Sequence, residues 1–184
     1  MTKRDIRWII RIVVSSIVLA MVFSLLSTTA LQETGYLVAA GLLLVFIFVG
    51  ILFDMVGVAV TAADETPFHS MAAHKGRGAK EAISLIKNAQ RVSSFCNDVV
   101  GDIAGIISGA GAAGIATRLV ADFSLSHIAI YVALSGFVVG LTIGGKAIGK
   151  SIAIGSSTRV VLFVARILYR KNWLLSKLFG RGAR

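Results

Sequence analysis

The sequence has few of the residues that build disulfides and metal centres. It contains a single cysteine, Cys96, in 184 residues, so neither an intramolecular disulfide nor a metal-binding thiol cluster can form. His69 and His74 are five positions apart and therefore not on one helical face, which argues against a zinc pair. Thiolate and histidine metal chemistry is therefore not expected.

Acidic residues are also scarce. The chain has 9 Asp and Glu against 19 Lys and Arg, a formal net charge of +10. A basic balance of this size can indicate nucleic acid, but here the cations flank apolar segments and lack interleaved aromatics. Membrane orientation and contact with anionic lipid explain them more simply, so membrane lipids are expected as partners and nucleic acid is not.

Catalytic patterns are missing as well. No nucleophile and base occur at helix-compatible spacing in the apolar segments. The Gly149-Lys150-Ser151 sequence lacks the strand and the first glycine of a phosphate-binding loop. We therefore expect neither an enzyme nor a resident cofactor.

Long apolar runs dominate what is present. Hydrophobic residues make up 56% of the chain and the mean hydropathy is +0.84, well above an ordinary soluble domain. Four segments are long enough to span a bilayer: about Ile6 to Leu31, Tyr36 to Val60, Val92 to Val120, and a fourth that starts near His127. The first is too long for the apolar region of a signal peptide, so a retained helix is expected.

The remaining polar sequence predicts short helices. Thr66-Pro67 suits a helix start with Thr66 as N-cap, and Ala79 to Ala89 predicts a second short helix after two glycines. A basic amphipathic stretch, 156–184, closes the chain. The sequence thus predicts an all-α integral membrane protein with four transmembrane helices, a cytoplasmic helical hairpin between spans two and three, and a C-terminal basic amphipathic helix. No polar stretch is long enough for a second domain, so 1–184 is expected to be a single membrane domain.

The distribution of cations predicts the orientation. Four Lys and Arg precede or open the first span, five lie between spans two and three, nine lie from Lys146 to the C-terminus, and only Arg118 is elsewhere. Because cytoplasmic loops collect Lys and Arg, both termini are expected to be cytoplasmic. Two glycine ridges, at 101, 105 and 109 and at 136, 140 and 144, predict close helix contacts.

Ionisable residues at membrane depth are costly and are therefore candidate functional residues. Asp98 and Asp102 are four apart on one face of span three, and Asn97 and Ser94 add oxygen atoms beside them. Asp54 lies near the end of span two and Lys146 lies in span four. Oxygen ligands of these kinds suit a hard cation such as Mg²⁺, so a metal site is predicted at Asp54, Ser94, Asn97, Asp98 and Asp102. The alternative is that Asp98 or Asp102 simply forms an internal ion pair with Lys146.

Two separated blocks resemble the transmembrane domain of the cyclin M/CorB/CorC family of magnesium transport proteins. The first, 53–91, is similar to a family segment that reads F-S-G-A-E-T-A-L-T followed by a basic hairpin, and the second, 145–153, is similar to the family's G-E-x-x-P-K-x-x-A motif. The matching residues of the first block include Phe53, Thr61, Gly78, Ala79, Lys80, Ala82, Leu85, Asn88 and Arg91. The resemblance implies an extra N-terminal span (1–35), a transport core (36–167) and a basic cytoplasmic tail (168–184).

The resemblance also implies a homodimer in the plasma membrane. Members of the family carry cytoplasmic CBS domains, which are not found in these residues. A separate cytoplasmic regulatory protein is therefore a possible partner. In the family, oxygen ligands come from the serine of the first block, a Gly-Asn region and the glutamate of the last block. Here Asp54 stands at the serine position, Lys146 at the glutamate position, and either Asn97-Asp98 or Gly101-Asp102 near the Gly-Asn region. Gly149 replaces the family's proline, and Gly144, Gly145 and Gly149 are predicted to break the helix.

Three functions follow as hypotheses. The first is transport of Mg²⁺ or another divalent cation, with Lys146 substituting for or gating the ion. The second is a transport-inactive membrane partner or regulator, in which Lys146 permanently occupies the ion site. The third is a lipid-handling membrane protein, suggested by the basic tail and the surface hairpin.

Overall fold

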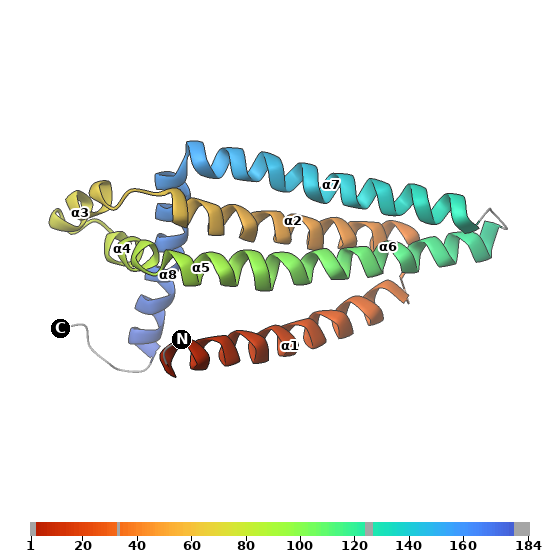
Figure 1. Cartoon of the computed structure of the whole chain (residues 1–184), viewed down its shortest axis with the longest axis horizontal. Coiled ribbons are helices and arrows are strands. Elements are labelled where there is room, and N and C mark those ends of the chain that lie inside the picture. The colour runs from red at the N-terminus through yellow and green to blue at the C-terminus, as the bar shows by residue number, and fades with distance from the viewer. Residues whose placement is uncertain (1–2, 33, 124–126, 179–184) are drawn as a thin grey trace. The chain divides into compact units, whose positions relative to one another are not determined.

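The computed structural model describes residues 3–32, 34–123 and 127–178, and these residues form helices and no strand (Figure 1). In chain order the elements are α1 (Lys3–Gln32), α2 (Tyr36–Ala62), α3 (Thr66–Ala73), α4 (Ala79–Lys87), α5 (Ala89–Ser94), the π-helical segment η1 (Phe95–Gly101), α6 (Asp102–Phe123), α7 (His127–Gly155) and α8 (Ser157–Leu178). Residue 33 of the predicted first turn and residues 179–184 of the predicted tail lie outside the described residues.

Four stretches of helix are long and apolar enough to cross a membrane: Ile6–Leu25, Tyr36–Ala62, Ala89–Asp122 and Ile128–Gly155. They confirm the predicted all-α membrane fold and agree closely with the four predicted spans. The third span differs in one respect, because it is built from α5, η1 and α6 rather than from one regular helix. Hydropathy does not reveal the π-helical turn, because the average hydropathy of a segment does not depend on whether its backbone hydrogen bonds follow an α- or a π-helical pattern.

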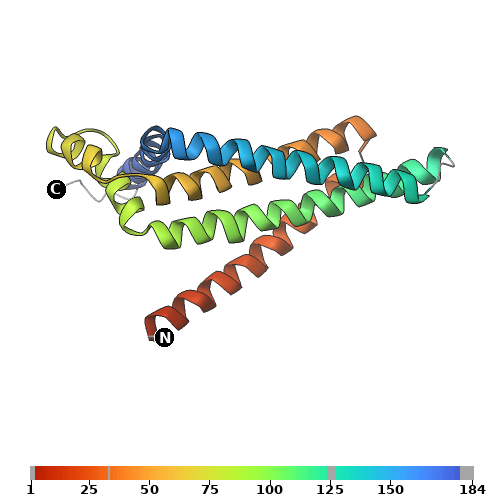
Figure 2. The ribbon, with the colours of Figure 1, turned by 45° about the horizontal axis from the view of Figure 1, so that its top comes forward.

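The chain folds into two compact units. The first consists of Met1–Asp54 and Phe95–Gly149, and the second of Met55–Ser94 and Lys150–Arg184. In the first unit α2, α6 and α7 lie side by side (Figures 1 and 2). Their shared core contains Ala39, Leu43, Ile47, Ala112, Ile115 and Val138. A Cβ atom added to Gly50 of α2 would lie 2.9 Å from the Ala104 Cβ of α6. The glycine therefore permits the close approach of these two helices, as small residues do in lipid.

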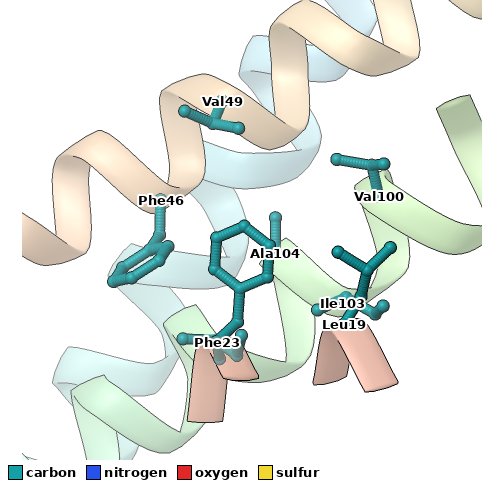
Figure 3. A pocket seen from close by; sticks show the side chains of 8 residues that line it. Leu19, Phe23, Phe46, Val49, Val100, Ile103 and Ala104 are labelled. Atoms are coloured by element: carbon teal, nitrogen blue, oxygen red, sulfur yellow. The ribbon is translucent and has the colours of Figure 1, made fainter. Parts of the chain in front are cut away.

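Helix α1 packs against η1 and α6 within the same unit. Its residues Ile12, Leu19, Ala20 and Phe23 contact a buried row formed by Val99, Ile103 and Ile107. Phe23 meets Phe46 of α2 edge to face, with ring centroids 6.1 Å apart, the arrangement that aromatic pairs favour. Figure 3 shows the entirely apolar cavity of about 20 Å³ beside this ring pair. Without polar partners, a space of this size does not hold water.

The second unit contains the helical hairpin α3–α4 and helix α8. Phe68 of α3, Ala82 of α4, and Val161 and Ala165 of α8 are fully buried together. Gly78 precedes α4 in a left-handed conformation with φ of +86°, and a Cβ atom there would lie 3.1 Å from the Arg166 backbone nitrogen. Glycine is needed at this position for both its backbone conformation and its small size, so the hairpin turn lies directly on α8.

The observed hairpin agrees with the predicted one except at its ends. Glu65, not Thr66, is the N-cap of α3, and Pro67 still lies in the first turn. Asp64 accepts hydrogen bonds from both the backbone N–H and the hydroxyl of Thr66, each 3.1 Å long. The backbone hydrogen bond is the main reason that the pKa of the Asp64 carboxyl is lowered. Helix α4 ends at Lys87, two residues earlier than predicted.

Candidate functional site

The first unit contains a buried ion pair between two spans. Asp54 of α2 is only 4% exposed, and its Oδ1 lies 3.8 Å from Nζ of Lys146 on α7. The side chain of Lys146 is 22% exposed. Sequence analysis predicted an internal ion pair of Lys146 as the alternative to a metal site, but with Asp98 or Asp102 as its partner. The carboxylate that contacts Lys146 is instead Asp54.

Gly101, the last residue of η1, lies beside this ion pair. A Cβ atom at this position would be 3.5 Å from Lys146 Nζ, 3.8 Å from Asp54 Oδ1 and 3.4 Å from the Cys96 carbonyl oxygen. Three spans therefore converge at one point: α2 brings the carboxylate, α7 the ammonium and η1 an uncovered stretch of backbone. A Cβ atom at Gly101 would thus be in ordinary contact with both charged groups, so the backbone of η1 lies directly beside the ion pair.

The π-helical segment also places the other predicted ligands. Asn97 of η1 has a buried side-chain oxygen, whereas Asp98 of η1 and Asp102 at the start of α6 are exposed. Asp98 and Asp102 therefore face away from the interior of the unit that buries Asp54. π-Helical turns frequently occur at functional sites in helices, and here the turn carries both Asn97 and Gly101.

The predicted metal ligands are divided between the two units. Ser94 ends α5 in the second unit, while Asp54, Asn97, Asp98 and Asp102 belong to the first. Within residues 3–32, 34–123 and 127–178, no group of three or more His, Cys, Asp or Glu side chains could hold a metal ion together. The five-residue metal site stays a prediction. Its buried members are Asp54 and Asn97.

The predicted helix break in α7 is not present. Helix α7 continues from His127 to Gly155 through Gly144, Gly145 and Gly149, because the helix keeps its own backbone hydrogen bonds through glycine. Gly145 has a packing role instead, since a Cβ atom there would collide with Cδ1 of Ile51 on α2. It is adjacent to Lys146 and lets α7 approach α2 closely enough for the ion pair to form.

Most glycines of the two predicted ridges face no other part of the described chain. A Cβ atom at Gly105 or Gly109 of α6, or at Gly136, Gly140 or Gly144 of α7, would have no neighbour within 4 Å. Gly101 is the member of the first ridge that faces other residues of the chain. The predicted close helix contacts are thus formed by Gly50, Gly101 and Gly145 rather than by the ridges as a whole.

A second polar cluster ties the start of α2 to the end of α6. The hydroxyl of Tyr36 donates a hydrogen bond to Asp122, and Arg118 donates one of 2.9 Å to the Thr34 carbonyl oxygen. The Arg118 guanidinium also lies 5.0 Å from the centre of the Tyr36 ring, within the range of a cation–π interaction. Arg118 was predicted as the one cation apart from the others, and this cluster gives it a structural role.

Comparison with known proteins identifies the family. The model of the cyclin M transmembrane N-terminal domain matches residues 41–179, more than half of the chain. No curated protein and no solved structure shows a significant match. The matched range contains the ion pair, η1, the hairpin and α8, and it begins after α1. The chain is therefore a multi-pass membrane protein that belongs to the cyclin M transmembrane domain family.

Proposed function

We propose that this protein transports Mg²⁺ or a related divalent cation, and that the region around Asp54 and Lys146 is its ion site. Membership of the cyclin M family supports cation transport in general. The convergence of Asp54, Lys146 and Gly101 supports the position, and Asn97, on the same π-helical segment as Gly101, has a buried side-chain oxygen. Carboxylate, amide and backbone oxygens are the ligands that Mg²⁺ accepts in proteins, and Lys146 is the charge that an entering cation must displace.

The distance within the ion pair sets the strength of that competition. Two unit charges 3.8 Å apart interact by about 4 kcal/mol at an effective dielectric constant near 20. A divalent ion carries twice the charge of the ammonium and can outcompete it once the lysine chain swings aside. Transport would thus couple ion entry to movement of Lys146.

A flux assay in liposomes tests this proposal. Asp54→Asn removes the buried carboxylate and is expected to abolish Mg²⁺ flux, whereas Asp64→Asn removes an exposed carboxylate from the hairpin and is expected to leave it unchanged. Asp98→Asn and Asp102→Asn test the exposed pair in the same way. If flux is unchanged in the Asp54 variant, the assignment of the ion site to Asp54 and Lys146 is wrong.

The same ion pair favours a second candidate function. A lysine permanently paired with Asp54 would make the domain a transport-inactive partner or regulator, in which the ammonium replaces the ion. Lys146→Glu is then expected to create Mg²⁺ binding that the wild type lacks, measured by calorimetry in detergent. Tight Mg²⁺ binding by the wild-type protein would contradict this second function and favour transport.

The proposed assembly is a homodimer in the plasma membrane with both termini cytoplasmic, regulated by a separate cytoplasmic protein. The open glycine faces of α6 and α7 and the exposed Asp98 and Asp102 support a second copy, because small residues favour helix association in lipid and exposed carboxylates there are costly. Cross-linking of cysteine variants at Gly105 or Gly140 tests this assembly. Accessibility of cysteines placed in the hairpin to impermeant reagents tests the orientation.

A further inference from the structure

The second unit contains an open, strongly basic cavity that the proposed ion transport does not use. The cavity has a volume of about 870 Å³ and lies between the turn of the hairpin and α8. Its lining includes Arg77, Arg166 and Arg170, together with Phe163 and Ile167. Its size is within the range of sites for small molecules and cofactors.

The three arginines converge because of the way the hairpin is held. Arg77 lies directly before Gly78, whose left-handed backbone fits against Ala165 and Arg166. Arg166 and Arg170 are four residues apart on α8 and therefore neighbours on one face of it. Like charges at this spacing repel each other. In the part of the chain that the structure describes, none of the three forms an ion pair with a carboxylate, so an anion from outside would relieve the repulsion.

The same face of α8 also carries exposed apolar side chains. Phe163 is 66% exposed and Ile167 is 53% exposed, and they alternate with the two arginines along one helical stripe. The opposite side of α8 is anchored by fully buried Val161 and Ala165. A ligand that satisfies the whole stripe needs both negative charge and an apolar portion.

The composition of the second unit points to where such a ligand comes from. The unit includes the last residues of α2, the first residues of the third span and the last residues of α7, so it lies where three spans leave the hydrocarbon region. The cavity is formed by residues that follow the fourth span by only 8 to 15 positions on α8. Headgroups of membrane lipids are present at this level.

We propose that this cavity binds the phosphate headgroup of an anionic lipid. Arg77, Arg166 and Arg170 contact the phosphate oxygens, and Phe163 and Ile167 contact the apolar start of the lipid. Guanidinium groups suit this role because their planar donors match phosphate geometry. The site belongs to the hairpin and α8, and its occupation does not depend on ion transport at Asp54.

Native mass spectrometry of the full chain in detergent tests the proposal with dioleoyl phosphatidic acid as the probe. The variant Arg77→Gln/Arg166→Gln/Arg170→Gln is expected to bind this lipid more weakly by a factor on the order of 100 or more, since each lost charge-assisted hydrogen bond to the phosphate costs roughly a tenfold factor. The matched control Lys80→Gln/Lys87→Gln/Arg159→Gln removes the same charge from exposed positions of the same unit that do not line the cavity. Its binding is expected to stay within about threefold of wild type, because these side chains do not line the cavity and exposed charges that do not contact the headgroup contribute little.

Three outcomes would overturn the proposal. Equal losses in the two triple variants would mean that general surface charge, not the cavity, attracts the lipid. Equal retention of phosphatidic acid and phosphatidylcholine by the wild type would mean that the headgroup is not recognised, and this comparison needs no variant to fold. Competition by millimolar inorganic phosphate as effective as that by the lipid would assign the cavity to a soluble phosphate instead. The variant Phe163→Ser separates the lipid from soluble phosphate as the source of the bound phosphate. It is expected to weaken binding of phosphatidic acid and to leave binding of inorganic phosphate unchanged.

Discussion

The ion pair between Asp54 and Lys146 makes a quantitative prediction about stability. At 3.8 Å, with side chains 6% and 22% exposed, the two charges attract each other by about 4 kcal/mol at an effective dielectric constant near 20. Removing one partner leaves the other charge buried without compensation, which costs about 3–5 kcal/mol. Asp54→Asn and Lys146→Met are each expected to destabilise the protein by roughly this amount.

Removing both partners together is expected to cost much less. The double variant Asp54→Asn/Lys146→Met leaves no uncompensated charge, and a neutral pair of similar volume in place of a buried ion pair is often nearly as stable. The coupling between the two substitutions should therefore be at least about 4 kcal/mol, beyond the usual range for residues in contact. Reversible unfolding by SDS in mixed micelles, followed by circular dichroism, gives the four free energies of unfolding that this cycle needs.

Additive effects of the two single substitutions would contradict the ion pair. If the two single substitutions add to within about 0.5 kcal/mol, the residues behave as independent sites, and the two charges do not interact in the folded protein. Adding Mg²⁺ to the wild type separates the two proposed functions in the same assay. Transport predicts stabilisation that requires Asp54, because a ligand that binds the folded state stabilises it, and a permanently occupying Lys146 predicts none.

Three further predictions concern packing and pH. Gly145→Ala is expected to cost about 1–3 kcal/mol in unfolding free energy because its Cβ would collide with a side chain of α2, while the matched Gly41→Ala of α2 faces open space and should cost nothing. Equal effects in these two variants would refute the close contact. Gly78→Ala is expected to cost about 1–2 kcal/mol because its φ of +86° is unfavourable for any residue with a Cβ; an unchanged melting temperature would argue against this turn. Because the pKa of Asp64 is lowered from its ordinary value of 3.8, its contribution to stability is present above that value and is lost as the pH falls through the lowered pKa; the NMR shift of the Thr66 amide should follow this titration, and a midpoint above 3.8 would contradict it.

Hydrophobic length and charge were enough to predict the fold class. The four spans and the hairpin depend on runs of apolar residues, on turn residues and on the cost of exposing backbone to lipid, and all of these are local. The family was also visible in the sequence, because two short blocks kept their residue types at fixed spacing. The ends of single helices were predicted to within a few residues, because turn and capping residues are local signals as well.

The tertiary structure alone decided which polar residues meet. Asp54 and Lys146 are 92 positions apart, and their pairing depends on how closely α7 approaches α2 at Gly145. The spacing of Asp98 and Asp102 on one helical face made them the obvious partners for Lys146, but the π-helical turn changes which residues of the third span point inward. That turn leaves no trace in composition, because one extra residue in a helix alters the direction of the side chains that follow and not the hydrophobicity of the segment. The sequence therefore determined that charges lie within the membrane, and packing between helices determined which of them form a site.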